Sequence, residues 1–370
     1  MLSETEFLCA EKQWQELLAS SDADPLFSSW YWASAWWQKI REANGNGAKL
    51  RLFLITNDDD QWLALAPCHL VLSELFRRPV NQLHLIGSGL PRGNLFRAEY
   101  RSLLLNREHA DELLPVLLAQ INQNTEWDEC FVGDLPKTTH LYGHYEQHLG
   151  TYGWFARETT SERGYSVSLK AGFKSYLMGI SGSARRQVFN KRRRLEGDGQ
   201  VTVVGPPELT LLDACQQLNA FHRERWNADA ISTDQLRFLE RACSLPGADT
   251  PRLAHSALRV EERVIGVLID IVVDRRQYNI QLGFDEHYDR ALSPGLLHLG
   301  YVMEHGSSNE IDRYEFLIGD GLTQNYKARF ASQVIPVTSL HIVRTRWLRV
   351  LHRCYQALRP GSSSRSRTAS

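Results

Sequence analysis

The stretch from Gln277 to Phe330 decides the fold of this 370-residue chain, and it reads QYNIQLGFDEHYDRALSPGLLHLGYVMEHGSSNEIDRYEFLIGDGLTQNYKARF. It begins with a strand-like run, residues 278–284, and continues through a loop to the tripeptide 293–295. A helix-like run follows and leads into a second strand-like run, residues 314–318. This order predicts two neighbouring strands joined by a crossover helix.

The tripeptide Ser293-Pro294-Gly295 predicts the start of that helix. Serine is a good N-cap residue, and proline suits the first helical turn. A helix that begins there points free backbone N–H groups and the positive end of its dipole at the mouth of the sheet. Such a helix start is an anion site, and ligands of α/β folds often bind between two strands in this way. An ordinary helix start without a ligand remains the alternative.

Length and composition place the chain among globular proteins of more than one domain. At 370 residues it is too long for one typical core, so we expect two domains. Hydrophobic residues make up 43% and charged residues 23%, which is ordinary for such proteins. The formal net charge of −1 gives no overall attraction to nucleic acid.

Nothing in the sequence indicates secretion, a membrane span or a cysteine framework. Residues 1–20 are acidic and interrupted, unlike a signal peptide. No apolar run reaches the ~18 residues that a membrane span needs. The six cysteines are scattered without a CxxC pair, which fits reduced thiols and argues against zinc knuckles and disulfides. We therefore expect a cytoplasmic protein.

Both halves of the chain predict helices combined with antiparallel strands. In the first half we expect helices at 30–41 and 109–123 and strands at 50–56, 62–72, 82–86 and 128–132. The turn-forming residues 57–61 predict that the first two of these strands pair as an antiparallel hairpin. The tryptophans of SSWYWASAWWQKI, in the first of these helices, are expected to pack in a core rather than line a groove. In the second half we expect helices at 173–180, 183–197, 209–225 and 231–245 and strands at 252–260, 264–273, 277–284, 314–318 and 334–343. The first three of these strands, joined by the short charged turns 261–263 and 274–276, predict an antiparallel meander, and the strand at 334–343 is expected to close the sheet.

Several short pieces of the second half share an order and spacing with a known family. The pieces are Tyr278 with 282–284, then 293–295, 316–320 and 326–327, and upstream 185–186 with 191–196. Together they resemble a GNAT-type acyltransferase domain of the CelD-like (cellulose-biosynthesis-protein-like) acetyltransferases. That family is similar to the Fem-type aminoacyltransferases of peptidoglycan assembly. The resemblance covers residues 173–330 well and the first half of the chain only loosely.

The resemblance implies an α/β (α+β) fold made of tandem GNAT-like domains, each with a mixed, mainly antiparallel sheet flanked by helices. We expect an N-terminal GNAT-like domain at 1–165, a C-terminal acyltransferase domain at 166–345, and a basic helix with a disordered tail at 346–370. The implied reaction moves an acyl group from acyl-CoA, such as acetyl-CoA, to an amine or hydroxyl. The implied acceptor belongs to cell-envelope or exopolysaccharide biosynthesis, and no metal is expected.

The donor site implied by the resemblance departs from the family pattern. GNAT enzymes usually hold the pyrophosphate with a loop of Arg or Gln, two residues, Gly, one residue, then Gly or Ala. Here the equivalent place has one glycine, and proline removes one N–H. We assign the donor to Arg290, Ser293, Gly295 and Leu296. Two alternatives stay open: aminoacyl transfer from charged tRNA, as in Fem-type relatives, and a non-catalytic scaffold. Nucleic acid is expected only under the first of these.

Catalysis is assigned to Asp320, Tyr326 and Lys327, which follow the strand at 314–318. Acyl transfer to an amine needs a base for the ammonium proton and an acid for the leaving group. A carboxylate suits the base, a tyrosine suits the acid, and Lys327 would stabilise charge on the donor. The alternative is that Asp320 caps a turn and Tyr326 packs in a core.

A dense basic run, SARRQVFNKRRRLEG, is the third candidate feature. In a helix Arg185 and Arg192 share a face, as do Arg186 and Arg193, and the guanidinium fork suits phosphate. We expect these four arginines, with Tyr278, to bind an anionic donor or acceptor. A solvated charged face is the alternative.

Two further patterns are weaker. His140, His144 and His148 recur at helical spacing, but no carboxylate or cysteine accompanies them, so we expect no metal there. Residues 344–359 alternate basic and apolar residues, which predicts a basic amphipathic helix. We expect it to pack on its own domain; contact with the inner face of a membrane is the alternative.

Overall fold

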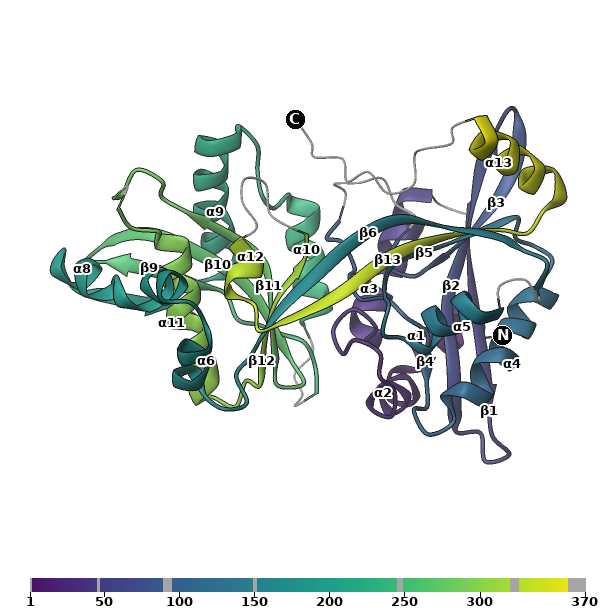
Figure 1. The fold of residues 1–370 in the computed structure, drawn as a ribbon, viewed down its shortest axis with the longest axis horizontal. Helices are drawn as coiled ribbons and strands as arrows, with labels where there is room; N and C mark the ends of the chain where they lie inside the picture. The colour runs from purple at the N-terminus through teal and green to yellow at the C-terminus, as the bar shows by residue number, and fades with distance from the viewer. Residues whose placement is uncertain are drawn as a thin grey trace. The chain divides into compact units, whose positions relative to one another are not determined.

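The computed structural model describes residues 2–44, 47–88, 95–148, 152–244, 249–289, 291–319 and 326–358. The chain forms two compact units. Unit 1 comprises 1–93, 97–162 and 335–370, and unit 2 comprises 94–96 and 163–334. Each unit combines a mainly antiparallel sheet with helices (Figure 1), which confirms the predicted α/β fold class.

Unit 1 begins with three helices, followed by strands and the long helix α4 (Ala110–Gln123). After the chain has formed unit 2, residues 335–370 complete unit 1. The elements of unit 1 are α1 (Glu4–Leu8), α2 (Glu11–Ala19), α3 (Trp30–Asn44), β1 (Ala48–Thr56), β2 (Trp62–Leu75), β3 (Arg78–Leu85), β4 (Leu104–Leu105), α4, β5 (Glu129–Pro136), α5 (His140–His148), the first half of β6 (Phe155–Ser168), β13 (Gln333–Val343) and α13 (Arg346–Leu358).

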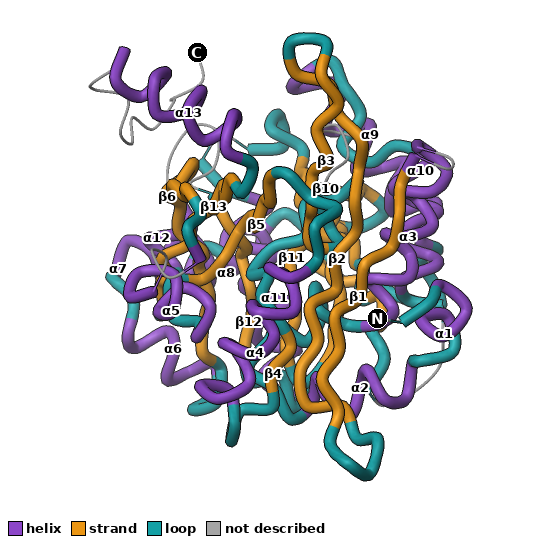
Figure 2. Tube along the Cα trace, turned by 90° about the vertical axis from the view of Figure 1, so that its right-hand side faces the viewer, coloured by secondary structure: helices purple, strands orange, loops and turns teal. Residues whose placement is uncertain are grey.

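The sheet of unit 1 has the order β1-β2-β3-β5-β13-β6, with β1, β2 and β3 forming the long meander seen in Figure 2. The predicted β1–β2 hairpin is confirmed. Its turn is fixed by Asn57, whose side-chain oxygen accepts hydrogen bonds from the N–H groups of Asp59 and Gln61. The apolar stripe of α4 packs on one face of the sheet. The tryptophans Trp32, Trp36 and Trp37 of α3 are buried, as the core interpretation predicts.

The elements of unit 2 begin with short helices, pass through two longer ones and end in a sheet. They are the second half of β6, α6 (Phe173–Gly179), α7 (Gly182–Arg185), the π-helical turn η3 (Arg186–Asn190), α8 (Arg192–Gly197), β7 (Val201–Val204), α9 (Leu211–Trp226), α10 (Thr233–Ala242), β8 (Arg252–Leu253), β9 (Ser256–Val260), β10 (Arg263–Val273), β11 (Arg276–Phe284), α11 (Pro294–Ser308), β12 (Arg313–Ile318) and α12 (Tyr326–Phe330).

The sheet of unit 2 has the order β6-β12-β11-β10-β9-β7, and the predicted meander of β9, β10 and β11 is confirmed. The crossover helix α11 packs on one face, where Leu299, Val302 and Met303 join the core. The backbone of α11 approaches η3 so closely that a Cβ on Gly300 would lie 1.9 Å from the carbonyl oxygen of Val188. Helix α9 packs on the other face of the sheet.

Strand β13 does not close the sheet of the second half, as we had expected for 334–343. It pairs with β5 of unit 1, whereas the second half of β6 pairs with β12 of unit 2. Each unit therefore takes in a strand from the opposite half of the sequence. The change of unit at residues 162–163 lies close to the predicted limit at 165, but the chain returns to unit 1 at Ile335 rather than leaving the second domain at 345. The expected division into 1–165 and 166–345 is corrected accordingly.

Helix α13 packs on unit 1. Leu348 is fully buried with Val80 and Val343, and Arg78 stacks over the ring of Trp347. This arrangement matches the preferred interpretation of the basic amphipathic helix. The expected disordered tail, from residue 359 onward, lies outside the described residues. Among the residues that the structure describes, no helix is long and apolar enough to span a bilayer.

Candidate functional site

The parallel strands β11 and β12 pair over only three residues and then separate. Their register joins 276 to 313, 277 to 314 and 278 to 315. Beyond this point β11 continues to Phe284 and β12 to Ile318 without pairing to each other. A bulge in the β10–β11 ladder falls at the same level, because the register shifts between Ile269 and Asp270. The result is a splay between β11 and β12 whose apex lies at residues 278 and 315.

A buried carboxyl group lies at the apex of the splay. Asp270 on β10 is fully buried. Its Oδ2 accepts hydrogen bonds from Gln277 Nε2 at 2.7 Å and from the Tyr314 hydroxyl at 2.9 Å. Its Oδ1 accepts one from Asn279 Nδ2 at 2.8 Å. Burial raises the pKa of Asp270 to about 7, although the three hydrogen bonds act in the opposite direction.

Sequence reasoning missed this cluster. Its signal was present: Asp270 is the one acidic residue inside the apolar strand RVIGVLIDIVV. Gln277, Asn279 and Tyr314 sit at alternate strand positions, so they share one face of the sheet with it. A charged residue in an otherwise buried strand predicts polar partners on neighbouring strands, because an unpaired buried charge is costly.

Two of the predicted catalytic residues lie where β12 ends. Tyr326 begins α12, and its ring lies 6.4 Å from that of Phe316. Burial raises the pKa of its hydroxyl, so the phenol is protonated at neutral pH. Lys327 Nζ donates hydrogen bonds to the carbonyl oxygens of Leu317 at 3.4 Å and Ile318 at 3.1 Å, which fastens α12 to the end of β12. Asp320 lies outside the described residues.

The predicted donor residues surround the start of α11. The helix begins at Pro294, as predicted, but the Ser293 side chain makes no capping hydrogen bond. The carbonyl oxygen of Ser293 instead accepts from the N–H groups of Leu296 and Leu297, each at 3.0 Å. The first turn therefore offers fewer free donors than a regular helix start. Arg290 lies outside the described residues.

Gly295 is required by packing at the helix start, because a Cβ there would lie 2.7 Å from the ring of Phe284. We expect Gly295→Ala to lower the free energy of unfolding by about 1–2 kcal/mol, since the aromatic ring must shift. The matched control is Gly143→Ala in α5, where a Cβ meets nothing within 4 Å. That control should leave stability unchanged or raise it by up to about 1 kcal/mol. Denaturant unfolding measures both, and equal effects of the two substitutions would contradict the packing argument.

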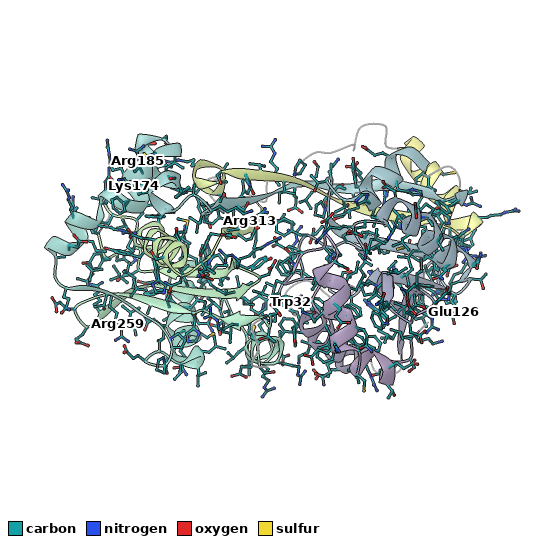
Figure 3. All side chains as sticks on the ribbon, turned by 90° about the horizontal axis from the view of Figure 1, so that it is seen from below. Trp32, Glu126, Lys174, Arg185, Arg259 and Arg313 are labelled. Atoms are coloured by element: carbon teal, nitrogen blue, oxygen red, sulfur yellow. The ribbon has the colours of Figure 1, made fainter. Side chains whose placement is uncertain are left out.

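The basic run does not form the single helix face that we expected, because the π-helical turn η3 interrupts the helix. Arg192 is buried, so we correct its predicted role in ligand binding. Its guanidinium pairs with Glu304 and stacks 3.8 Å from the ring centre of Tyr301, so it joins α8 to α11. Arg185 donates to the carbonyl oxygen of Leu177 at 2.8 Å, which ties α7 to α6. Figure 3 labels Arg185 with Lys174, a residue of α6.

Arg186 and Arg193 are the two members of the set that remain exposed. Among the described residues no ion pair or hydrogen bond of their side chains is seen. Tyr278, in contrast, is fully buried in the sheet. It cannot reach a ligand in this arrangement, so its assignment to substrate binding is corrected. The assignment of Arg186 and Arg193 stays a prediction.

Two surface depressions among the described residues lie in unit 1, and neither includes a residue of β11, β12 or α11. One of them, of about 800 Å³, is lined by α4 and α5 and includes His140 and His144. His140 Nδ1 is 2.9 Å from Asp111 Oδ1, and His144 Nε2 is 3.2 Å from the Tyr152 hydroxyl. These pairings account for two of the three histidines that recur in α5. We therefore take the splay in unit 2, and neither of these depressions, as the candidate site.

A comparison with protein families finds one match. Residues 182–328 match the family described as "Acetyltransferase (GNAT) domain". This range contains η3, the meander, α11, the splay and the first residues of α12. No curated protein matches the chain.

Solved structures share the fold at low sequence identity. FemX superposes with a TM-score of 0.63 at 11% identity, over 92% of this chain and 98% of that chain. A conserved protein of unknown function from Bacteroides thetaiotaomicron reaches 0.50 at 11% identity, over 91% and 97%. A tandem GNAT protein from the clavulanic acid biosynthesis pathway reaches 0.48 at 11% identity, over 92% and 95%.

The solved structures show the fold over nearly the whole chain. The match of residues 182–328 to the GNAT acetyltransferase domain supports acyltransferase chemistry in the second half of the chain.

Proposed function

We propose that unit 2 transfers an acyl group from an acyl-CoA thioester, such as acetyl-CoA, to an amine or hydroxyl acceptor. The observation that carries the proposal is the splay of β11 and β12, which has the start of α11 beside the end of β11 and falls within the matched GNAT domain. A helix start attracts phosphate, and diverging parallel strands leave backbone groups free to bind an extended donor.

The donor would lie with its phosphates at the start of α11, near Arg290, Ser293, Gly295 and Leu296. Its thioester would then point toward the apex of the splay. The acceptor amine attacks the thioester carbonyl, the C–S bond breaks, and the amide bond forms. Asp320 would take the proton that the amine loses, and Tyr326 would give its proton to the leaving thiolate. Solvent then restores both groups, so the protons balance.

Lys327 has a supporting role in this scheme. Its ammonium group already donates to the carbonyls of Leu317 and Ile318. It would therefore hold Tyr326 at the end of β12. It would also add positive charge near the thioester carbonyl of the donor, which becomes an oxyanion during the reaction.

The acceptor is proposed to be anionic and to belong to envelope or polysaccharide assembly. The resemblance to the CelD-like and Fem-type families motivates the class of acceptor. The exposed guanidinium groups of Arg186 and Arg193 motivate its charge.

The double variant Arg186→Glu/Arg193→Glu should weaken binding of the donor or the acceptor by roughly fivefold to tenfold at low salt. The difference should shrink as salt rises, because exposed charges are screened within ~10 Å at 0.1 M. The charge-matched control is Arg237→Glu/Arg252→Glu, also exposed and in unit 2. Titrations at two salt concentrations measure the effect. Equal binding by both double variants would show that the basic run is a solvated charged surface that binds no ligand.

Calorimetric titration with acetyl-CoA, combined with detection of released thiol, tests the proposed function. Saturable binding and thiol release in the presence of amine acceptors are expected. Absence of binding would contradict the acyl-CoA donor.

Aminoacyl transfer from charged tRNA is the second candidate. It is favoured by the helix start itself, where Pro294 lacks an N–H and the N–H groups of Leu296 and Leu297 are already bonded to Ser293. Acceptor modification by a charged tRNA without CoA binding would support this candidate. A non-catalytic scaffold would show neither activity.

A further inference from the structure

Three side chains from distant parts of the sequence meet between the sheet of unit 1 and α13. They are Glu129 on β5, His341 on β13 and His352 on α13, and their ligand atoms all lie within 4.8 Å of one another. Glu129 Oε2 is 2.7 Å from His341 Nε2 and 4.0 Å from His352 Nε2. The side chains are 8%, 4% and 17% exposed, so the cluster is largely removed from water.

One polar atom that points into the cluster has no hydrogen-bond partner. His352 Nε2 is buried and has no hydrogen-bond partner, although it lies next to the carboxylate oxygen that His341 contacts. A buried polar atom without a partner is unfavourable, and in native proteins it often marks an unseen water or ion. Here the atom belongs to an imidazole that lies next to a second imidazole and a carboxylate.

Neighbouring side chains hold the three groups in place. Gln82 Nε2 donates a hydrogen bond to Glu129 Oε1 at 2.8 Å, which leaves Oε2 directed at the two histidines. The ring of Phe131 stacks on His341 with centroids 4.4 Å apart. The ring of Phe155 stacks on His352 at 6.1 Å. Such outer contacts fix the orientation of ligands in metal sites.

We infer that Glu129, His341 and His352 form a binding site for a divalent transition-metal ion, with Zn²⁺ the best fit. Two imidazole nitrogens and one carboxylate oxygen are a donor set that zinc uses, with water in the fourth position. Ligand atoms about 2.0–2.2 Å from a tetrahedral zinc ion stand roughly 3.3–3.6 Å apart. The observed separations of 2.7 and 4.0 Å lie on either side of this range, so small side-chain movements are enough. Calcium and magnesium prefer oxygen ligands alone.

The ion would join α13 to the sheet of unit 1. Two of its ligands come from adjacent strands, where 129 pairs with 343, and the third comes from the helix that follows. The sequence analysis expected no metal, and residues 129, 341 and 352 form no spacing pattern that predicts a site. Only the late return of β13 to unit 1 brings them together.

The affinity should be below that of a closed structural zinc site. His341 Nδ1 has no hydrogen-bond partner to fix the tautomer of the ring. The positive charge of Arg157 acts on His352 and opposes the binding of a cation there. Arg157→Gln should therefore tighten metal binding.

The test uses the full-length chain without a histidine tag, stripped of metal by a chelator. Titration with Zn²⁺ against a chromophoric chelator should give one equivalent bound, and Co²⁺ should give the visible absorption of a four-coordinate ion. Zinc should also raise the midpoint of thermal unfolding. His352→Ala and Glu129→Gln should each weaken binding by at least about tenfold.

Two control variants separate this site from other metal-binding groups. His144→Ala removes a histidine of the same unit that bonds Tyr152, and Cys354→Ser removes an exposed thiol two residues from His352. Both should bind zinc as the unchanged protein does. Less than about one-tenth of an equivalent bound, or equal affinity in His352→Ala and the unchanged protein, would overturn the inference. Loss of binding in Cys354→Ser alone would overturn it as well.

Discussion

Replacing Tyr326 by phenylalanine is expected to lower turnover about a hundredfold or more, because the leaving thiolate loses its proton donor. The affinity for the donor should change little, since the ring remains in place beside Phe316. Burial raises the pKa of this hydroxyl, which keeps it protonated and able to act as an acid. Steady-state kinetics with saturating donor measure the effect. Asp320→Asn should cause a loss of similar size if Asp320 is the base.

The matched control for Tyr326→Phe is Tyr142→Phe in unit 1. Tyr142 carries a phenol hydroxyl that hydrogen-bonds with Lys137 and Glu158. The control should keep full turnover, which separates loss of a catalytic proton from loss of any hydrogen-bonded hydroxyl. Full activity in Tyr326→Phe would refute the assignment.

The second large effect concerns stability and pH. Asp270 has a pKa of about 7 in the folded protein and 3.8 as its ordinary value. A carboxyl whose pKa rises on folding binds protons more tightly in the folded state, so its contribution to stability falls as pH rises from about 4 to about 7. Between pH 5 and pH 8 the free energy of unfolding should fall by on the order of 2 kcal/mol because of this group.

Asp270→Asn should remove that pH dependence. The asparagine carbonyl can still accept from Gln277 and Tyr314, and a reoriented Asn279 amide can accept from the new amide group. Denaturant unfolding at pH 5 and pH 8 should show the variant gaining stability relative to the unchanged protein as pH rises. Asp312→Asn is a suitable control, because Asp312 is paired with Arg275 and its pKa is lowered. A constant difference between Asp270→Asn and the unchanged protein at both pH values would contradict the account.

Local patterns in the sequence predicted most of the elements of the fold. Pro294 marked the start of α11, and Asn57 with its neighbours marked the β1–β2 turn. The meander of β9, β10 and β11 followed from apolar strands separated by short charged turns. These features depend on interactions between residues close in sequence, which is why they are readable without the structure.

The exchange of strands was not readable in the same way. Nothing in the sequence of β13 or of β6 identifies the strand with which it pairs. Strand pairing depends on contacts between residues far apart in sequence, such as Leu340 with Val132. The domain limits and the cluster around Glu129 both follow from this pairing, so both escaped prediction.

The candidate site was predicted in part. Tyr326 and Lys327 were selected by resemblance, and they lie at the end of β12. Arg192 was misassigned because seven-residue spacing presumes a regular helix, and η3 changes the phase by a π-helical turn. Tyr278 was misassigned because a strand residue beside a cleft can face either side of the sheet.

A structure with acetyl-CoA bound tests the central claim most directly. The account predicts that the phosphates contact the first turn of α11, near Ser293 and Leu296, and that the thioester lies between β11 and β12 within reach of the Tyr326 hydroxyl. Donor bound elsewhere in the chain, with the space between β11 and β12 filled by protein, would contradict it.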